Sequence, residues 1–130
     1  MLTTIHNLDY VVLLCRDLER MKAFYSGTLG FPIVRDGDAW CEMRVGATLL
    51  TLRPRGRPYD GIIPPGVAGV QLAFRVAPDE VGACFEELAA KGVIMLEPPQ
   101  DKRYGHLTFF FKDPEDNILE IYADVARRED

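Results

Sequence analysis

The sequence has no apolar run close to the ~20 residues that a membrane-spanning helix needs, although 48% of its 130 residues are hydrophobic. The start, MLTTIHNLDY, lacks the basic residues, apolar stretch and small-residue cleavage site of a signal peptide. Cysteines are few, and Cys15, Cys41 and Cys84 have no CxxC spacing, as is typical of buried, reduced thiols. We therefore expect a cytoplasmic protein without a membrane partner.

Clustered positive charge is scarce as well. The chain has 15 Lys and Arg against 20 Asp and Glu, which gives a net charge of −5. Only residues 53–57 gather basic side chains, whereas nucleic-acid binding needs a broad basic surface to neutralise phosphates. The sequence also lacks a glycine-rich phosphate loop and a serine or cysteine nucleophile beside a base. These absences predict no nucleic-acid partner and exclude the best-known hydrolase and nucleotide-binding patterns.

One pattern of segments is present twice in the chain. An aliphatic strand at 11–14 precedes Asp17, which is suited to cap an amphipathic helix that ends at Gly30. The strand VQLAFRV likewise precedes a helix from Asp79 to Gly92, and both helical intervals span 13 residues. Three strand-like pieces follow each helix: FPIVRD, AWCEMR and ATLLTLR in the first half, then VIMLEP, HLTFFFKD and NILEIYAD in the second.

This repeat predicts the α+β fold class and a single domain over residues 1–130. We expect two βαβββ modules, at about 5–55 and 67–124, with a Pro- and Gly-rich linker at 54–66 and a tail at 125–130. The modules are expected to pair into an eight-stranded, open, curved mixed sheet. Its helices would cover the convex face, and the concave face would be left as a cavity.

Two stretches, VVLLCRDLERMKAFYSGTLGF and FFFKDPEDNILEI, carry a resemblance to a known family. With their spacing, the chain resembles the vicinal oxygen chelate superfamily from about Ile5 to Asp124. That superfamily includes glyoxalase I, extradiol dioxygenases, fosfomycin-modifying enzymes and bleomycin-binding proteins. The resemblance implies a homodimer. It also implies a divalent metal, held in the family's enzymes by a His on the first strand of each module and a Glu on the last strand.

This chain departs from the implied ligand set. The first ligand position, seven residues before Asp17, holds Tyr10, and the second His position holds Gln71. A further acidic ligand of some members would fall near Thr51, so Glu120 is the only family-type ligand retained. A phenol and a neutral amide are poor ligands for a transition metal. We therefore expect no catalytic metal and no cofactor, while a metal pair of His106 and Glu120 stays open.

The expected cavity mixes aromatic, aliphatic and a few polar side chains, as small-molecule sites do. Strand alternation directs His106, Thr108 and Phe110 to one face and their neighbours to the other. The candidate ligand-binding residues are Tyr10, Val12, Gln71, His106, Thr108, Phe110, Glu120 and Tyr122, with Trp40 and Tyr104 at the edge. Burying Glu120 requires a partner, and the expected partner is Tyr10, Gln71, Arg75 or a bound cationic ligand.

Three functions follow from this sequence. The first is metal-free binding of a small aromatic or peptide-like molecule, as in a drug-binding or resistance protein. The second is an atypical lyase, isomerase, dioxygenase or thiol transferase of the same superfamily, with Glu120 or His106 as general base. The third is a structural or regulatory module whose concave face is sealed by side chains.

Overall fold

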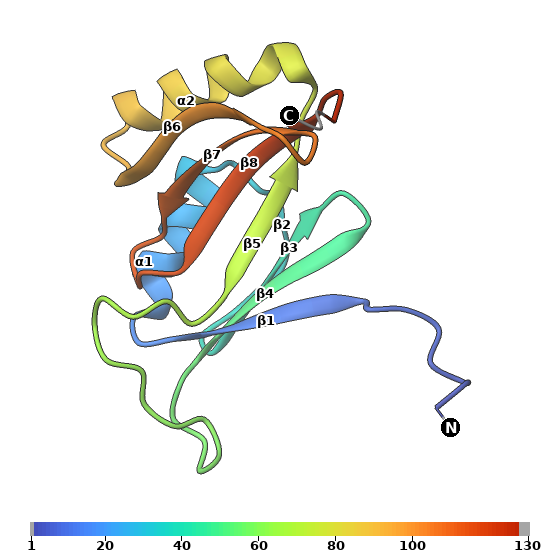
Figure 1. Cartoon of the computed structure of the whole chain (residues 1–130). Coiled ribbons are helices and arrows are strands. Elements are labelled where there is room, and N and C mark those ends of the chain that lie inside the picture. Colours follow the sequence, from blue (N-terminus) through green and yellow to red (C-terminus); the bar gives the residue numbers. More distant parts are fainter. Residues whose placement is uncertain (1, 128–130) are drawn as a thin grey trace. The chain divides into compact units, whose positions relative to one another are not determined.

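The computed structural model describes residues 2–127, and the chain divides into two compact units at the boundary between Ile62 and Ile63. This boundary falls inside the segment expected to be the linker. Each unit contains one four-stranded mixed sheet and one helical segment after its first strand (Figure 1). The two predicted βαβββ modules are confirmed, and each is described by itself below.

The first unit contains one helix and four strands. In chain order these are β1 (Tyr10–Cys15), α1 (Leu18–Lys22), β2 (Ile33–Gly37), β3 (Trp40–Val45) and β4 (Thr48–Pro54). The strands lie in the order β1-β4-β3-β2, with β1 parallel to β4 and the other pairs antiparallel. A parallel pair needs a crossover connection, and α1 with β2 and β3 supplies it.

The first helical segment begins at the predicted cap and ends before Gly30, which has the positive φ of 78° of a C′ glycine, but its second half is not an α-helix. Asp17 is its N-cap, and a side-chain oxygen of Asp17 accepts a hydrogen bond from the Arg20 N–H at 3.1 Å. After Lys22 the chain continues as a π-helical segment, Ala23–Thr28. The wider turn lets Phe24 and Tyr25, which are adjacent in sequence, both be buried, with their rings edge to face at 5.1 Å.

The core of the first unit lies between α1 and one face of the sheet. The strand residues buried there alternate with residues on the other face, as the pleat requires. They are Leu13, Cys15, Cys41, Met43, Leu50 and Leu52. The helical segment contributes Leu18, Met21, Phe24 and Tyr25 to the same core.

The second unit repeats this plan. Its elements are β5 (Gln71–Arg75), α2 (Val81–Ala90), β6 (Met95–Lys102), β7 (His106–Lys112) and β8 (Ile118–Asp124). The strand order is β5-β8-β7-β6, again with one parallel pair, β5 and β8. A 3₁₀ turn at Pro78–Glu80 precedes α2, and the Glu80 carboxylate accepts a hydrogen bond from the Ala77 N–H at 2.9 Å.

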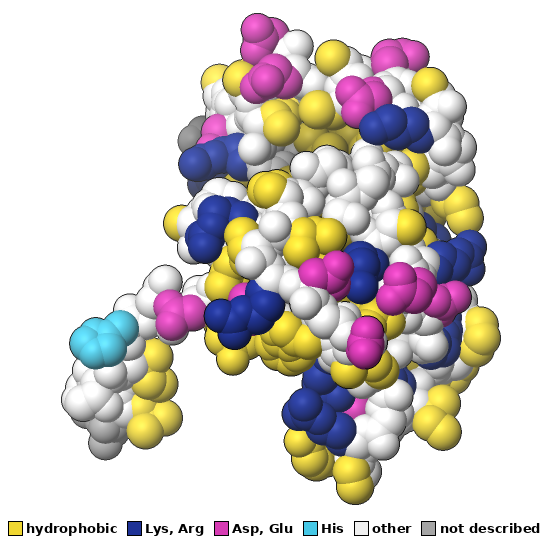
Figure 2. Space-filling model, turned by 180° about the vertical axis from the view of Figure 1, so that it is seen from behind, with side chains coloured by type: hydrophobic (Ala, Val, Ile, Leu, Met, Phe, Trp, Pro, Cys, Tyr) yellow, Lys and Arg dark blue, Asp and Glu magenta, His cyan; other side chains and the backbone are white. Residues whose placement is uncertain are grey.

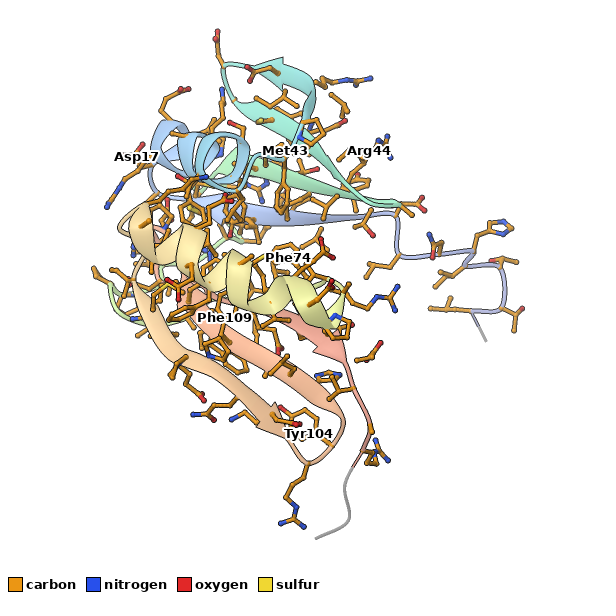
Figure 3. All side chains as sticks on the ribbon, turned by 90° about the horizontal axis from the view of Figure 1, so that it is seen from above. Asp17, Met43, Arg44, Phe74, Tyr104 and Phe109 are labelled. Carbon is orange, nitrogen blue, oxygen red and sulfur yellow. The ribbon has the colours of Figure 1, made fainter. Side chains whose placement is uncertain are left out.

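Aromatic side chains fill the space between this second sheet and α2. Phe109 is fully buried, and its ring meets that of Phe85 on α2 edge to face at 5.4 Å. Phe74 on β5 and Phe109 on β7 both lie on the side of the sheet that α2 covers (Figure 3). The opposite face of the sheet is therefore the one that α2 leaves uncovered.

A tight turn between β7 and β8 holds the start of the second unit. Asp116 adopts a positive φ of 71°, a left-handed conformation that Asp tolerates better than most residues. Its carboxylate accepts a hydrogen bond from the Gly66 N–H at 2.7 Å, and the Asn117 side chain accepts one from the Gly69 N–H at 3.2 Å. The turn thus binds the segment that leads into β5.

The residues before β1 extend away from the first sheet, and they expose apolar side chains (Figure 2). Leu2, Ile5 and Leu8 are between 68% and 83% exposed. Within residues 2–127, neither helix is long and apolar enough to cross a bilayer.

The cysteines match the sequence-based expectation in part. Cys15 and Cys41 are buried and Cys84 on α2 is half-buried, and none of the three forms a disulfide. Burial raises the pKa of the Cys41 and Cys84 thiols.

Candidate functional site

The uncovered face of the second sheet gathers most of the predicted site residues. Ladder partners in a sheet share a face, and Glu120 on β8 is opposite Ala73 on β5 and Phe110 on β7. Tyr122 is likewise opposite Arg75 and Thr108. The predicted alternation along these strands is therefore confirmed.

Glu120 lies at the centre of a small hydrogen-bond cluster. Its side chain is buried, and Oε2 accepts a hydrogen bond from the Thr108 hydroxyl at 2.7 Å. Its other oxygen, Oε1, accepts a hydrogen bond from the Gln71 amide at 3.2 Å. The Thr108 hydroxyl also lies 3.1 Å from the Ile121 carbonyl, so its one proton is shared between two acceptors. Two neutral side chains thus satisfy this buried carboxylate.

A group of aromatic rings adjoins this cluster, where β7 begins and β8 ends. The rings of His106 and Tyr122 are stacked, with centroids 4.3 Å apart and planes at 26°. Tyr104, in the turn before β7, meets the His106 ring edge to face at 5.2 Å. Asp124 lies 3.7 Å from both His106 Nε2 and Arg75. The edge of the face therefore offers stacked rings bordered by charged groups.

The structure corrects one detail of the expected Glu120 environment. Gln71 was a predicted partner, but Thr108 supplies the shorter hydrogen bond and was expected only as a general pocket residue. Thr108 is opposite Tyr122, two residues along β8 from Glu120, so the contact is diagonal across the hairpin. Strand alternation in the sequence placed residues 108 and 120 on the same face of the sheet. Which of the side chains on that face meet depends on the register of β7 against β8, which the sequence does not reveal.

The remaining predicted residues lie on the first sheet, on the face away from α1. Tyr10 and Val12 share this face because their ladder partners are Leu49 and Thr51 on β4. Tyr10 is 50% exposed, so the phenol is not buried among core residues. Trp40 on β3 donates a hydrogen bond from its indole nitrogen to Glu42 Oε1 at 2.8 Å.

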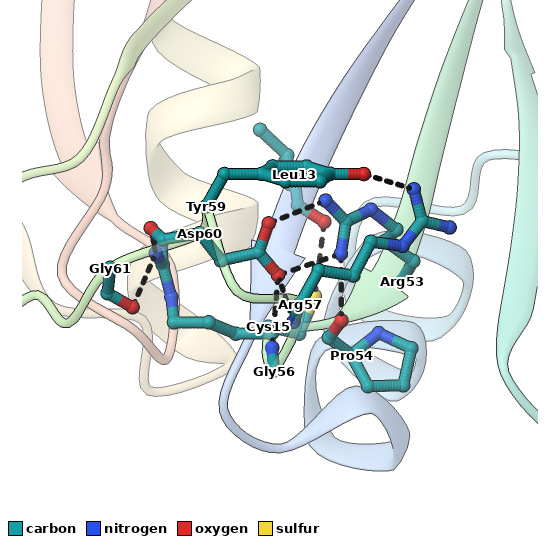
Figure 4. Close-up of polar contacts among 10 residues, drawn as sticks. Leu13, Cys15, Arg53, Pro54, Gly56, Arg57, Tyr59, Asp60 and Gly61 are labelled. Carbon is teal, nitrogen blue, oxygen red and sulfur yellow. Dashed lines mark hydrogen bonds and ion pairs between the residues drawn. The ribbon is translucent and has the colours of Figure 1, made fainter.

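A tightly bonded loop follows β4 and was missed by the sequence analysis. Arg53 pairs with both carboxylate oxygens of Asp60 at 2.9 and 2.8 Å, and the N–H groups of Gly56 and Arg57 also donate to Asp60 (Figure 4). The Arg53 hydrogen bonds, with the Gly56 N–H, hold the pKa of Asp60 well below its ordinary value of 3.8. Its role is to fix the shape of residues 53–61.

Comparison with known proteins now places the chain in a family. A profile of the Glyoxalase/Bleomycin resistance protein/Dioxygenase superfamily matches residues 7–121. The chain belongs to this superfamily. The match spans both βαβββ units.

Several known proteins are similar to this chain along nearly their whole length. The uncharacterized protein YwkD of Bacillus subtilis is 31% identical over 128 residues, which covers 89% of this chain and 95% of that protein. A glyoxalase/bleomycin resistance protein/dioxygenase from Nocardioides has a TM-score of 0.81 at 19% identity, covering 98% and 92% of the two chains. A lactoylglutathione lyase from Agrobacterium tumefaciens has a TM-score of 0.74 at 18% identity, covering 93% and 96%. At these identities the two solved structures show the shared fold alone.

The strand registers relate the two modules position by position. In the first module Thr51 pairs with Val12, which lies two residues after Tyr10 on β1. In the second module Glu120 pairs with Ala73, which lies two residues after Gln71 on β5. Tyr10 thus corresponds to Gln71, and Thr51 to Glu120. These four are the positions at which the superfamily resemblance placed metal ligands.

The side chains at these positions do not fit a divalent transition metal. Such a metal needs three or four protein donors, chiefly imidazole, thiolate or carboxylate. Glu120 is the one carboxylate among the four positions, and its neighbours in the cluster are a neutral amide and a hydroxyl. Throughout the described part of the chain, no group of three His, Cys, Asp or Glu side chains is placed to hold a metal ion.

Proposed function

We propose that this superfamily member binds a small aromatic or peptide-like molecule without a catalytic metal, in the manner of a drug-binding or resistance protein. The observation that carries the proposal is the engagement of both Glu120 oxygens by neutral side chains, Thr108 and Gln71. A carboxylate that ligates a metal turns its lone pairs to the ion. Here each Glu120 oxygen already accepts a hydrogen bond from a neutral side chain, which favours a structural or ligand-contacting role.

The aromatic edge of the same face supports an aromatic ligand. His106 and Tyr122 already stack on each other, and Tyr104 adds a third ring that is 53% exposed. Flat rings attract further rings through offset or edge contacts. Half-buried Phe110, opposite Glu120, extends the apolar surface toward the carboxylate. Gln71, which is exposed, can offer its remaining amide groups to a polar substituent.

Calorimetry in excess EDTA tests the proposal directly. Bleomycin and a panel of aromatic drugs are titrated into protein stripped of metal, and we expect at least one to bind with micromolar or tighter affinity. Replacing Tyr122 by Leu removes the stacked ring and should weaken that binding about two- to tenfold, since a stacked aromatic pair contributes roughly 0.5–1.5 kcal/mol beyond its buried area.

Tyr59→Leu is the matched control for this experiment. Tyr59 is 77% exposed in the loop after β4 and has no part in the second sheet, so its replacement should leave the affinity unchanged. Binding that strictly requires added metal would contradict the proposal. Equal losses of affinity in Tyr122→Leu and Tyr59→Leu would show that the ligand does not bind at the face that carries Tyr122.

A second candidate function is an atypical enzyme of the superfamily with Glu120 as general base. The burial of Glu120, which is 8% exposed, favours it because buried carboxylates on an uncovered face are often reactive groups. Elemental analysis of protein purified without chelator separates the two candidates. Near-stoichiometric Ni, Zn, Mn or Fe, together with loss of turnover in Glu120→Gln, supports the enzyme. A binder would lose affinity at most.

A further inference from the structure

The first sheet contains a buried hydroxyl that has no hydrogen-bond partner. Thr51 is fully buried on β4, and its Oγ1 is the one buried side-chain polar atom in residues 2–127 that lacks a partner. Native proteins rarely leave such a group unpaired, because its lost hydration is not compensated. An unpaired buried group therefore marks a position where a ligand or a water molecule completes the hydrogen bonding.

A carboxylate lies directly opposite this hydroxyl. Glu42 on β3 is the ladder partner of Thr51, so the two side chains share the face away from α1. Glu42 is half-buried, and its Oε1 accepts the indole hydrogen bond of Trp40 at 2.8 Å. Trp40, two residues earlier on the same strand, lies diagonal to Thr51. A carboxylate, a hydroxyl and an indole ring thus adjoin one another.

The charge of Glu42 is not neutralised by the protein. Arg35 is the ladder partner of Glu42 on β2, and Arg44 is the next residue of β3 on the same face. Both arginines are exposed, and within residues 2–127 neither forms an ion pair with Glu42. A half-buried carboxylate that accepts one neutral hydrogen bond gains most from a charged donor.

We propose that Trp40, Glu42 and Thr51 form a subsite on the first sheet that binds a protonated amine. The ammonium group donates to Glu42 and to Thr51 Oγ1, and the indole face of Trp40 attracts it through a cation–π contact. This inference rests on the proposed small-molecule role and specifies the chemical class of the ligand. Because Thr51 is fully buried, we expect the Trp40 ring to shift so that the ammonium can reach Thr51 Oγ1, and the shifted ring then lies against the bound ammonium.

Trp40 is the only tryptophan of the chain, so its emission reports on this subsite alone. Wild-type protein in EDTA is titrated with 2-phenylethylamine, 2-phenylethanol and 3-phenylpropionate while the fluorescence emission of Trp40 is followed. We expect the amine to bind with a Kd of about 1 mM or tighter, the range open to a fragment of this size. The neutral alcohol and the carboxylate should bind at least about tenfold more weakly.

Two substitutions separate the carboxylate from the hydroxyl. Glu42→Gln keeps an acceptor for the Trp40 indole but removes the charge, and it should abolish the preference for the amine over the alcohol. Thr51→Val removes the hydroxyl at nearly constant volume, so it should weaken amine binding while thermal stability stays equal or rises. Asp38→Asn, in the exposed turn before β3, changes the net charge as Glu42→Gln does, and it should alter neither the affinity for the amine nor the preference for the amine over the alcohol.

The outcomes distinguish this subsite from the proposed function. Equal affinity for amine and alcohol, or amine binding that Glu42→Gln leaves intact, overturns the subsite, and so does absence of binding at millimolar amine. Tighter binding of 3-phenylpropionate than of the amine also overturns the subsite, and it would indicate that Arg35 and Arg44 bind the ligand on this face. If drug binding in EDTA still depends on Tyr122 in these cases, the proposed function stands without the amine subsite. If binding needs metal, the proposed function fails, and the amine preference measured with metal present decides the subsite by itself.

Discussion

Two buried threonines of this chain have opposite surroundings. Thr108 donates to Glu120 at 2.7 Å and lies 3.1 Å from the Ile121 carbonyl, whereas Thr51 has no partner. Both are essentially unexposed. The same substitution, Thr to Val, should therefore have different consequences at the two positions, because only one of the hydroxyls stabilises a neighbour.

Thr108→Val leaves Glu120 Oε2 without its shorter hydrogen bond, and we expect a loss of about 1–3 kcal/mol in the free energy of unfolding. Thr51→Val removes an unpaired polar group and should be neutral or slightly stabilising in ligand-free protein. Urea unfolding of both variants measures the difference. Equal losses would mean that Thr51 also has a partner in solution.

At the scale of elements, the loop after β4 owes its shape to one carboxylate. Asp60 is paired with Arg53, and these hydrogen bonds hold the pKa of Asp60 below its ordinary value of 3.8. A carboxyl group with a lowered folded-state pKa stabilises the fold fully above its unfolded-state pKa. That stabilisation is lost as the pH falls through the range below it.

Asp60→Asn should therefore lower the thermal midpoint at pH 7, where the wild-type carboxylate is charged. The gap between the two proteins should narrow below about pH 4, because Asp60 of the unfolded wild-type chain then takes up a proton while the folded carboxyl group stays charged. Thermal melts from neutral to acid pH measure the gap. The control, Asp38→Asn, lies in an exposed turn and should give little difference at any pH. A gap that widens in acid would contradict the assignment.

The turn between β7 and β8 gives a second prediction for an element. Asp116 has a positive φ and accepts the Gly66 N–H at 2.7 Å. Asp116→Gly suits the left-handed backbone but deletes this acceptor, so overall stability should change little while the Gly66 amide exchanges faster. Asp116→Asn tolerates the same conformation and keeps an acceptor oxygen. Hydrogen exchange should therefore separate the two variants, and identical Gly66 protection in both would show that the contact is unimportant.

The elements themselves could be predicted because their causes are local. The Asp17 cap, the helix stripe and the alternation on β7 depend on neighbours in sequence, and all three are confirmed. The π-helical segment Ala23–Thr28 was not predicted, because it follows from how Phe24 and Tyr25 pack in the core.

Contacts between segments were the part that sequence reasoning could not supply. The hydrogen bond from Thr108 to Glu120 depends on the hairpin register, and the pair of Arg53 and Asp60 depends on a loop without a periodic pattern. The unpaired state of Thr51 is a property of its surroundings, which no residue type reveals. The ligand-binding assignments of Tyr10, Val12, Trp40 and Phe110 stay predictions.

At the scale of the whole molecule, the superfamily resemblance implies a homodimer. The chain mass is 14.6 kDa, so a dimer should scatter light as a particle of about twice that mass, provided that the working concentration exceeds its Kd. Size-exclusion chromatography with light scattering, at two concentrations about tenfold apart, measures this. A constant mass near 14.6 kDa at both concentrations would contradict the expectation.

The three thiols are divided between the two units of the chain, so the rate of thiol alkylation can be followed separately in each unit. Cys15 and Cys41 are enclosed in the first unit, while Cys84 belongs to α2 of the second. An alkylating reagent can modify the enclosed pair only when the first half opens, and burial raises the pKa of both Cys41 and Cys84, which slows any reaction in the closed state. Pulsed alkylation followed by mass spectrometry can thus compare the alkylation rate of the first unit with that of the second, without adding a probe to either sheet.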